Sequence, residues 1–143
     1  MSVDRYFVDS NVVLYTYDKF DRVKRAQAKA WVSWLWDNAN GALSWQVLQE
    51  FYFNALRKFQ VPAASARDAV RSLAEWNHPD VTIGLMERAW YWVDEAQLSF
   101  WDAMILAAAE RAECRYLLSE DFQPGQKFDS VTVVNPFKTS PPF

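Results

Sequence analysis

The chain has 143 residues, of which 51% are hydrophobic and 17% aromatic, and its formal net charge is −3. This composition excludes an intrinsically disordered chain and fits one domain, residues 1–143, with a substantial hydrophobic core. No apolar run approaches the roughly 20 residues that a membrane helix requires, so no membrane association is expected. A protein that binds nucleic acid by charge alone would usually be basic.

The first half of the chain predicts a strand, a short helix and a long helix. Tyr6-Phe7-Val8 is the β-rich run of the strand, and Ser10 or Asn11 is expected to cap the short helix that follows. The long helix is expected over residues 22–38 and ends before Gly41. Its expected stripe of helical spacing contains Ala26, Ala30, Trp34 and Val23.

The rest of the chain continues this alternation of strands and helices. Further strands are expected over residues 42–44, 80–83, 116–118 and 131–134. Further helices are expected over residues 45–59, 62–76, 85–95 and 99–113, and the proline-rich tail from residue 135 is expected to be irregular. Strands separated by helices predict a parallel sheet covered on both faces, with ligands bound at the carboxyl ends of its strands.

Four acidic residues stand in or just after apolar segments without a basic partner nearby in the chain: Asp9, Glu50, Asp102 and Asp121. Glu50 and Asp102 have no Lys or Arg three or four residues away on their expected helices. Asp9 and Asp121 follow two expected strands, which places both at one edge of the sheet. Such carboxylates are costly unless they are paired, hydrogen-bonded or bound to metal. If they converge, their repulsion would raise some of their pKa values until a divalent cation arrives.

Each of these acids also has a structural explanation. Asp9 fits a helix cap, Asp121 fits a turn, and Ser99 with Asp102 fits a capping box. Glu50 is the hardest to explain in this way, because it lies on or near the buried stripe of its helix. The joint arrangement of the four acids favours a site.

The chemistry of such a site is narrowed by the scarcity of His and Cys. Mg²⁺ and Mn²⁺ prefer oxygen ligands, whereas Zn²⁺ normally takes His or Cys, of which this chain has one each. A bound Mg²⁺ or Mn²⁺ can position a phosphodiester and activate a water molecule. A ribonuclease without metal would usually need a well-placed His, and His78 stands alone before Pro79, where a turn or surface position is expected.

Other residues favour structural roles. Cys114, the single cysteine, precludes an internal disulfide, is expected to be a small buried residue, and favours the reducing cytoplasm. The N-terminus lacks the layout of a signal peptide, because Asp4 and Asp9 interrupt it. Tryptophans at near-helical spacing are expected to pack in the core or at a subunit interface, with stacking on nucleic-acid bases as the alternative: Trp31, Trp34, Trp90 and Trp92.

Basic residues gather in three places along the chain. The clusters are Arg22, Lys24, Arg25 and Lys29, then Arg57 and Lys58, then Arg67 and Arg71. Each cluster by itself is typical of a solvated helix face. A rim that contacts phosphate, around a site whose negative charge a metal offsets, is the functional alternative.

Five segments together resemble the PIN-domain proteins, and in particular the VapC-type toxins of bacterial toxin–antitoxin pairs. The segments are Phe7-Val8-Asp9-Ser10-Asn11, residues 44–52, Ser99-Phe100-Trp101-Asp102-Ala103, residues 117–121 and residues 133–137. They follow the order of the family over nearly the whole chain. The resemblance implies a three-layer α/β/α sandwich with a mostly parallel five-stranded sheet, and an endoribonuclease that depends on Mg²⁺ or Mn²⁺.

The resemblance also implies site residues and partners. The family's acids match Asp9, Glu50, Asp102 and Asp121, with Asn11 and Ser119 as polar neighbours and Glu120 at a variable position. Asp9, Asp102 and Asp121 are expected to hold the metal. The expected partners are an RNA substrate, a small cognate antitoxin and a second copy of the chain in a homodimer.

Two other classes of protein fit parts of the pattern. A phosphatase with an aspartate nucleophile, or a phospho-accepting receiver, also places an Asp at the end of an early strand. The phosphatase expects an acid two residues later, where this chain has Asn11, and the receiver expects an acidic pair that is not evident. The other class is a non-catalytic module that binds RNA or dimerises.

Overall fold

A single mixed sheet organises the molecule, as the computed structural model of residues 4–142 describes it. Within these residues five strands pair in the order β2-β1-β3-β5-β4. They are β1 (Tyr6–Val8), β2 (Gly41–Ala42), β3 (Tyr116–Leu118), β4 (Lys127–Phe128) and β5 (Val131–Val134). The pairs among β1, β2, β3 and β5 are parallel, whereas β4 runs antiparallel to β5 at the edge. The predicted α/β class with a mostly parallel five-stranded sheet is confirmed.

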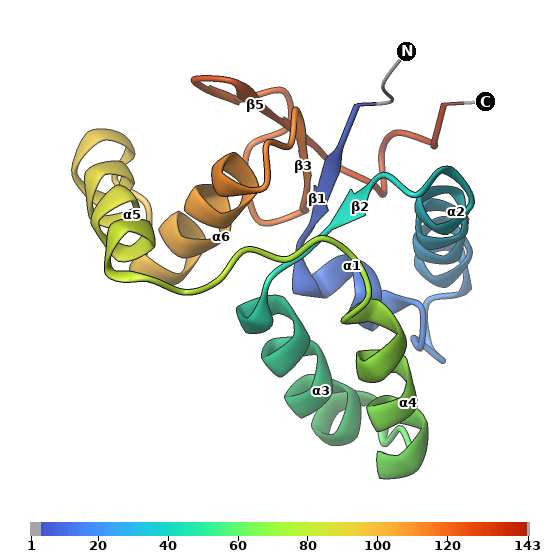
Figure 1. Cartoon of the computed structure of the whole chain (residues 1–143). Helices are drawn as coiled ribbons and strands as arrows, with labels where there is room; N and C mark the ends of the chain where they lie inside the picture. Colours follow the sequence, from blue (N-terminus) through green and yellow to red (C-terminus); the bar gives the residue numbers. More distant parts are fainter. Residues whose placement is uncertain (1–3, 143) are drawn as a thin grey trace.

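Helices cover both faces of the sheet and also lie beyond the carboxyl ends of its parallel strands. Within residues 4–142 they are α1 (Ser10–Tyr15), α2 (Arg22–Asn38), α3 (Trp45–Phe59), α4 (Ala63–Leu73), α5 (Ile83–Ala96) and α6 (Phe100–Arg111). Figure 1 shows α6 beside one face with α5 outside it, and α2 beside the other face. It also shows α1, α3 and α4 beyond the carboxyl ends of the strands, where a ligand would bind. The domain predicted over residues 1–143 includes residues 1–3 and 143, which lie outside the described part.

The expected strand over residues 80–83 is wrong. Thr82 Oγ1 accepts a hydrogen bond from the backbone N–H of Leu85 and caps α5, which begins at Ile83. The β-branched residues there favour a strand locally, but Val81 and Ile83 are 55% and 65% exposed and pack into no sheet. The fifth strand is β4, a two-residue element that the sequence pattern does not reveal.

The helix over residues 22–38 matches its predicted range, but its buried face is displaced. The residues that α2 buries are Ala28, Trp31 and Leu35, whereas Val23 is 82% exposed. The helix ends with Ala39 in the left-handed conformation, at φ 52°, and not with a glycine. Gly41 is required for a different reason: a Cβ atom there would lie 2.6 Å from the Trp76 ring.

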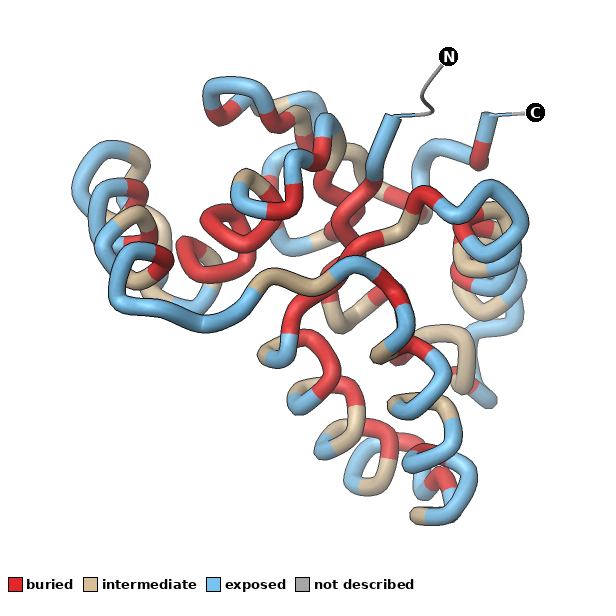
Figure 2. Tube along the Cα trace, viewed as in Figure 1, coloured by how far each residue is buried: buried red, intermediate tan, exposed pale blue. Residues whose placement is uncertain are grey.

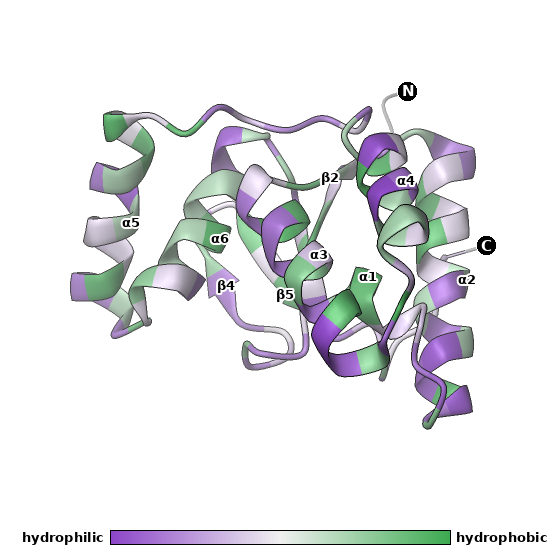
Figure 3. Cartoon of the chain, turned by 90° about the horizontal axis from the view of Figure 1, so that it is seen from below, coloured by the Kyte–Doolittle hydropathy of each residue, from purple (hydrophilic) through white to green (hydrophobic). Residues whose placement is uncertain are grey.

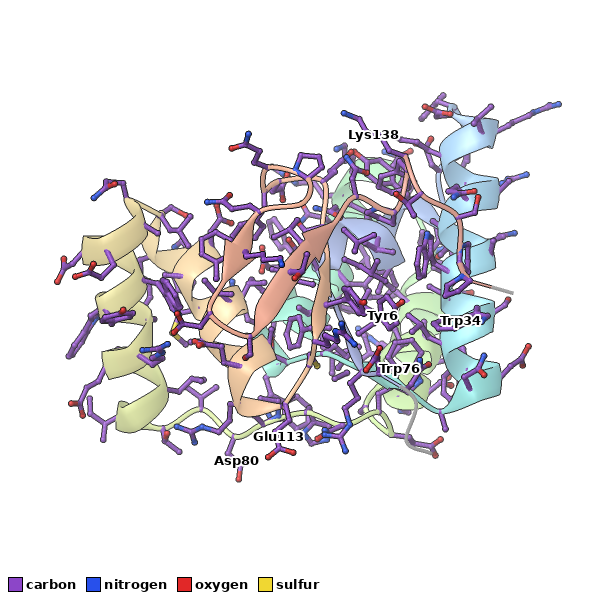
Figure 4. All side chains as sticks on the ribbon, turned by 90° about the horizontal axis from the view of Figure 1, so that it is seen from above. Tyr6, Trp34, Trp76, Asp80, Glu113 and Lys138 are labelled. Carbon is purple, nitrogen blue, oxygen red and sulfur yellow. The ribbon has the colours of Figure 1, made fainter. Side chains whose placement is uncertain are left out.

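The core lies on both sides of the central strands, as the buried segments in Figure 2 show. In α6, all residues from 103 to 109 are buried, because the helix lies between the sheet and α5. On the other face the Tyr6 ring centre lies 5.3 Å from that of Trp34, and both residues are labelled in Figure 4. The Tyr6 ring centre also lies 5.5 Å from that of Trp31. The fold therefore uses aromatic rings to fix β1 against α2.

Most of the tryptophans that were expected to pack do so. Trp31 and Trp92 are buried, and Trp34 packs partly buried against the core. The Trp31 indole N–H donates to the carbonyls of Pro136 and Thr139, at 3.0 and 2.9 Å, and so holds the irregular C-terminal tail against α2. Trp90 is 46% exposed and therefore lies outside the core.

Cys114 and His78 are both withdrawn from the surface, wholly and in part respectively. Cys114 is buried as predicted, and burial raises the pKa of its thiol to about 12. His78 is half-buried with its ring 4.6 Å from that of Trp45, so it is less exposed than a surface residue. No helix within residues 4–142 is both long and apolar enough to cross a lipid bilayer.

Candidate functional site

Two neighbouring strands deliver the first acids to one edge of the sheet. β1 ends at Val8 and β3 ends at Leu118, and these two residues pair in register. Asp9 and Ser119 therefore follow side by side, and the backbone N–H of Asp9 donates to the Leu118 carbonyl at 3.0 Å. The parallel arrangement accounts for their meeting, because the carboxyl ends of parallel strands lie at the same edge.

A chain of hydrogen bonds joins the residues that follow these strands. Ser119 Oγ donates to Asp9 Oδ2 at 2.7 Å and accepts from the backbone N–H of Asp121 at 3.1 Å. Asn11 Nδ2, from the first turn of α1, donates to Asp121 Oδ2 at 2.9 Å. Asp9 is 4% exposed, and its Oδ1 accepts from the Ser10 N–H at 2.7 Å, so Asp9 is the cap of α1 in place of Ser10 or Asn11. The cap and the site thus share one carboxylate.

Glu50 and Asp102 approach these residues from two helices, near enough for the charges of Asp102 and Asp121 to act on Glu50 and that of Asp121 to act on Asp102. Glu50 lies in the middle of α3, and Asp102 lies in the first turn of α6, where Ser99 Oγ accepts from its backbone N–H at 3.2 Å. Gln46 Nε2 of α3 donates to the Trp101 carbonyl of α6 at 3.2 Å, which ties the two helices together beside the acids. The capping predicted for Ser99 is confirmed, and it orients the helix turn that carries Asp102.

The four acids act on one another electrostatically. Burial, together with the nearby charges of Asp121 and Glu50, raises the pKa of Asp9 to about 7. Burial also raises the pKa of Glu50, with Asp102 and Asp121 adding to the effect, and it raises the pKa of Asp102 with Asp121 as the charged neighbour. We call Asp9, Glu50, Asp102 and Asp121 the acidic cluster. Mutual repulsion of this kind is what a bound cation relieves.

The acidic cluster has oxygen donors that suit Mg²⁺ or Mn²⁺, although they are engaged with protein groups. In their present positions, no three His, Cys, Asp or Glu side chains within residues 4–142 are grouped closely enough to hold a metal ion. Both oxygens of Asp9 and one of Asp121 accept hydrogen bonds from the protein. Glu50 Oε1 and Asn11 Oδ1 are buried without a hydrogen-bond partner, which is costly. These two unpaired oxygen atoms, together with the nearby carboxylates, fit a bound cation, because Mg²⁺ and Mn²⁺ would be coordinated by such oxygen atoms.

The neighbourhood of the cluster contains features that the sequence pattern did not reveal. Lys24 of α2 forms an ion pair with Glu120 at 2.8 Å and lies 4.3 Å from the centre of the Tyr15 ring. This contact fastens the loop that carries Asp121. A cavity of about 450 Å³ also opens between α1 and α3, whose ribbons lie side by side in the view from below (Figure 3). Both features join segments that are far apart in the sequence, and spacing along the chain carries no signal for them.

Among the solved structures that match this chain, three are similar over most of its length. The toxin VapC20 of Mycobacterium tuberculosis, described as cleaving the sarcin–ricin loop, is 25% identical over 81% of this chain and 91% of its own, with a TM-score of 0.63. A toxin–antitoxin complex from Klebsiella pneumoniae is 19% identical over 92% and 97%, with a TM-score of 0.66. VapBC2 of Rickettsia felis, bound to a DNA fragment from its promoter, is 13% identical over 90% and 96%, with a TM-score of 0.62. The last two show likeness of fold alone.

The family model is the more decisive comparison. A search of curated proteins finds no match to this chain. The family model described as "PIN domain" matches residues 6–127, which include all four acids of the cluster and both polar neighbours. This match sets aside the phosphatase and receiver alternatives, and it confirms the resemblance found in the sequence. The chain belongs to the PIN domain family.

Proposed function

We propose that the protein is an endoribonuclease that depends on Mg²⁺ or Mn²⁺ and serves as the toxin of a type II toxin–antitoxin pair. The observation that carries the proposal is the hydrogen-bond chain through Ser119 and Asn11 that joins Asp9 to Asp121. Glu50 and Asp102 lie near enough for their charges to act on these acids or to be acted on by them. Membership of the PIN domain family and the likeness to a toxin that cleaves the sarcin–ricin loop support it.

The residues of the cluster have separate roles in this proposal. Asp9, Asp102 and Asp121 would hold the metal directly or through water, and Ser119 and Asn11 orient Asp9 and Asp121 respectively. A bound Mg²⁺ or Mn²⁺ would neutralise phosphate charge and lower the pKa of a water molecule.

Glu50 completes the cluster or orients the attacking water. It is half-buried, and its Oε1 atom has no hydrogen-bond partner in the protein. Burial and the charges of Asp102 and Asp121 raise the pKa of Glu50, which brings the carboxylate nearer to the range in which it can accept a proton. Water-mediated cleavage of this type does not require the 2′-hydroxyl, so the preference for RNA rests on the family.

The activity is tested with purified protein and labelled RNA. We expect cleavage with Mg²⁺ or Mn²⁺, none in EDTA, and a loss of at least about 100-fold in the Asp9→Ala/Asp102→Ala double variant, because two ligands are removed. Asp68→Ala, on the exposed face of α4, is the matched control and should keep full activity. Equal cleavage by the double variant and the wild type would reject the proposal and indicate a contaminating nuclease.

The proposed partners need separate tests. A short neighbouring reading frame for a DNA-binding protein, and inhibition of cleavage by its purified product, would establish the antitoxin. Sedimentation equilibrium measures whether the chain forms the predicted homodimer. The cytoplasmic location also stays a prediction, which fractionation of cells can test.

A non-catalytic RNA-binding module is the competing proposal. It keeps the same fold and the same acids but requires no turnover. Calorimetric titration discriminates between the two proposals, because the module predicts RNA binding without Mg²⁺ or Mn²⁺ binding. Heat of metal binding that disappears in the Asp9→Ala/Asp102→Ala variant favours the enzyme.

A further inference from the structure

The cavity beside the acidic cluster has an acidic end and a basic end. Its polar lining residues are Ser10, Asn11, Glu50, Asn54, Arg57 and Lys58. Glu50 belongs to the acidic cluster, and Asn11 holds Asp121, so the cavity is continuous with the candidate site. An occupant of the cavity is therefore adjacent to any phosphodiester held by the acids.

The polarity of the cavity comes from one face of α3. Glu50, Asn54 and the pair Arg57-Lys58 are spaced four and then three or four residues apart, which places them in a row along the helix. This row rises about 11 Å from its acidic to its basic end. Asn54 in the middle is held by its Nδ2 donating to the Glu50 carbonyl at 2.9 Å.

Arg57 and Lys58, the two cations at the basic end, form no ion pair with an acidic residue within residues 4–142. Arg57 contacts Asn54 Oδ1 at 3.4 Å and the Phe53 ring at 5.2 Å, and Lys58 lies 5.9 Å from the Tyr15 ring. In this they differ from Lys24, Arg71, Arg88 and Arg115, which do form ion pairs. Their position in the last turn of α3 suits the helix dipole. The dipole does not account for the cavity that they line.

We propose that this cavity is a phosphate-binding subsite for the RNA chain, in which Arg57 and Lys58 hold a phosphodiester next to the one that is cleaved. The inference rests on the proposed ribonuclease function and adds the residues that hold the substrate. Guanidinium, ammonium and side-chain amide donors suit phosphate oxygens. The lining offers one apolar residue, Leu14, and no aromatic ring for a base. In a chain of net charge −3, these cations offset the repulsion between RNA and the acids.

An acidic segment of a protein partner would use the same donors, but the position of the cavity favours the substrate. Because Glu50 belongs both to the cluster and to the lining of the cavity, an RNA backbone bound at the cluster would continue directly into the cavity. Glu50 repels carboxylates and phosphates alike, so the continuity of the cavity with the cluster, and not charge, favours the substrate.

The test measures RNA binding where cleavage is suppressed. A short fluorescein-labelled single-stranded RNA is titrated in EDTA against the Asp102→Asn variant, alone and with Arg57→Ala/Lys58→Ala added. We expect the dissociation constant to rise about tenfold and the salt dependence of the logarithm of the binding constant to fall by about one unit, because one phosphate is no longer neutralised. With Mn²⁺ and otherwise wild-type protein, the same double substitution should raise KM more than it lowers kcat.

The matched control is Arg111→Ala/Arg115→Ala, which makes the same change in net charge. Both residues are exposed and lie near the opposite edge of the sheet, at the end of α6 and just before β3. Arg57→Lys/Lys58→Arg keeps both charges and should restore most of the binding. Thermal melting should be nearly unchanged by each of these Arg and Lys substitutions, since the replaced side chains are exposed.

Three results would overturn the subsite. These are equal RNA affinity with and without Arg57→Ala/Lys58→Ala, an equal loss in the Arg111→Ala/Arg115→Ala control, or binding of a hexaglutamate peptide by a protein that binds no RNA. The last result would assign the cavity to an acidic protein segment. Binding in EDTA does not depend on turnover, so failure of metal-dependent cleavage rejects the enzyme and leaves the binding result to be judged by itself.

Discussion

Asp9 combines two roles that make opposite demands on its charge. As the cap of α1 and the acceptor for Ser119, it is 4% exposed and surrounded by protein. As a member of the acidic cluster, it lies near the charges of Asp121 and Glu50. Burial therefore favours the protonated acid, whereas a bound cation would favour the carboxylate. The stability of the metal-free protein should depend on pH for this reason.

Without metal, we expect the free energy of unfolding to fall as the pH rises from about 4 to 7. The pKa of Asp9 is about 7 in the folded protein and about 3.9 in an unfolded chain. The folded state holds the proton over this window and the unfolded state releases it, so rising pH favours unfolding, by up to about 4 kcal/mol. Asp9→Asn removes this contribution. Denaturant titrations in EDTA at pH 5 and pH 8 measure the effect, and an unchanged pH dependence in Asp9→Asn would contradict it.

At the scale of elements, Arg88 connects three parts of the fold. From α5 it donates to both carboxylate oxygens of Glu110 in α6, at 3.0 and 2.8 Å, and to Asp129 in the turn between β4 and β5 at 2.8 Å. The Trp92 indole N–H donates to the same Glu110 at 2.6 Å. Bidentate contacts of this kind are the stronger class of ion pair. α5 is thereby fastened to the outside of α6.

Arg88→Ala should destabilise the protein by about 1 to 3 kcal/mol, because Glu110 would keep its partly buried charge without a cation. Arg71→Ala is the control, since it breaks the ion pair with Asp68, whose two side chains are 73% and 78% exposed. Urea titrations of both variants provide the comparison. An effect of Arg71→Ala as large as that of Arg88→Ala would mean that the network around Glu110 has no special role.

The elements show where sequence patterns are sufficient. α2 and α3 begin and end where their patterns predict, because long helices carry caps and several turns of periodicity. Residues 80–83 have strand-forming side chains, but the cap at Thr82 and the packing of α5 decide the outcome. β4 has two residues and depends on pairing with β5, which local preference does not encode.

At the scale of the whole molecule, the acidic cluster draws on four separate segments. Asp9 and Asp121 were predictable neighbours because they follow adjacent parallel strands. Glu50 and Asp102 lie on helices whose positions depend on packing. Their proximity to the other two acids could therefore be predicted only from the family resemblance, and otherwise needs the structure. Arg57 and Lys58 were visible as a basic pair, but the cavity that gives them a role exists only in three dimensions.

Metal binding should therefore stabilise the whole fold and not one loop. We expect the melting temperature to rise with Mn²⁺ in the wild type, since a ligand that binds only the folded state adds about 2.7 kcal/mol at 100 times its dissociation constant. The Asp9→Ala/Asp102→Ala variant should melt at one temperature with and without Mn²⁺. Differential scanning calorimetry at several Mn²⁺ concentrations makes the measurement. A similar rise in the variant would place the metal elsewhere.

The hydrogen bond from the Asp9 amide to the Leu118 carbonyl has a consequence for experiments in solution. It is the last rung between β1 and β3, and the same residue carries the buried carboxylate of the acidic cluster. Deuterium can replace this amide proton only when the strand ends separate. The exchange rate of this one amide therefore reports how often the sheet edge beneath the cluster opens, and how far a cation, an RNA or an antitoxin slows that opening.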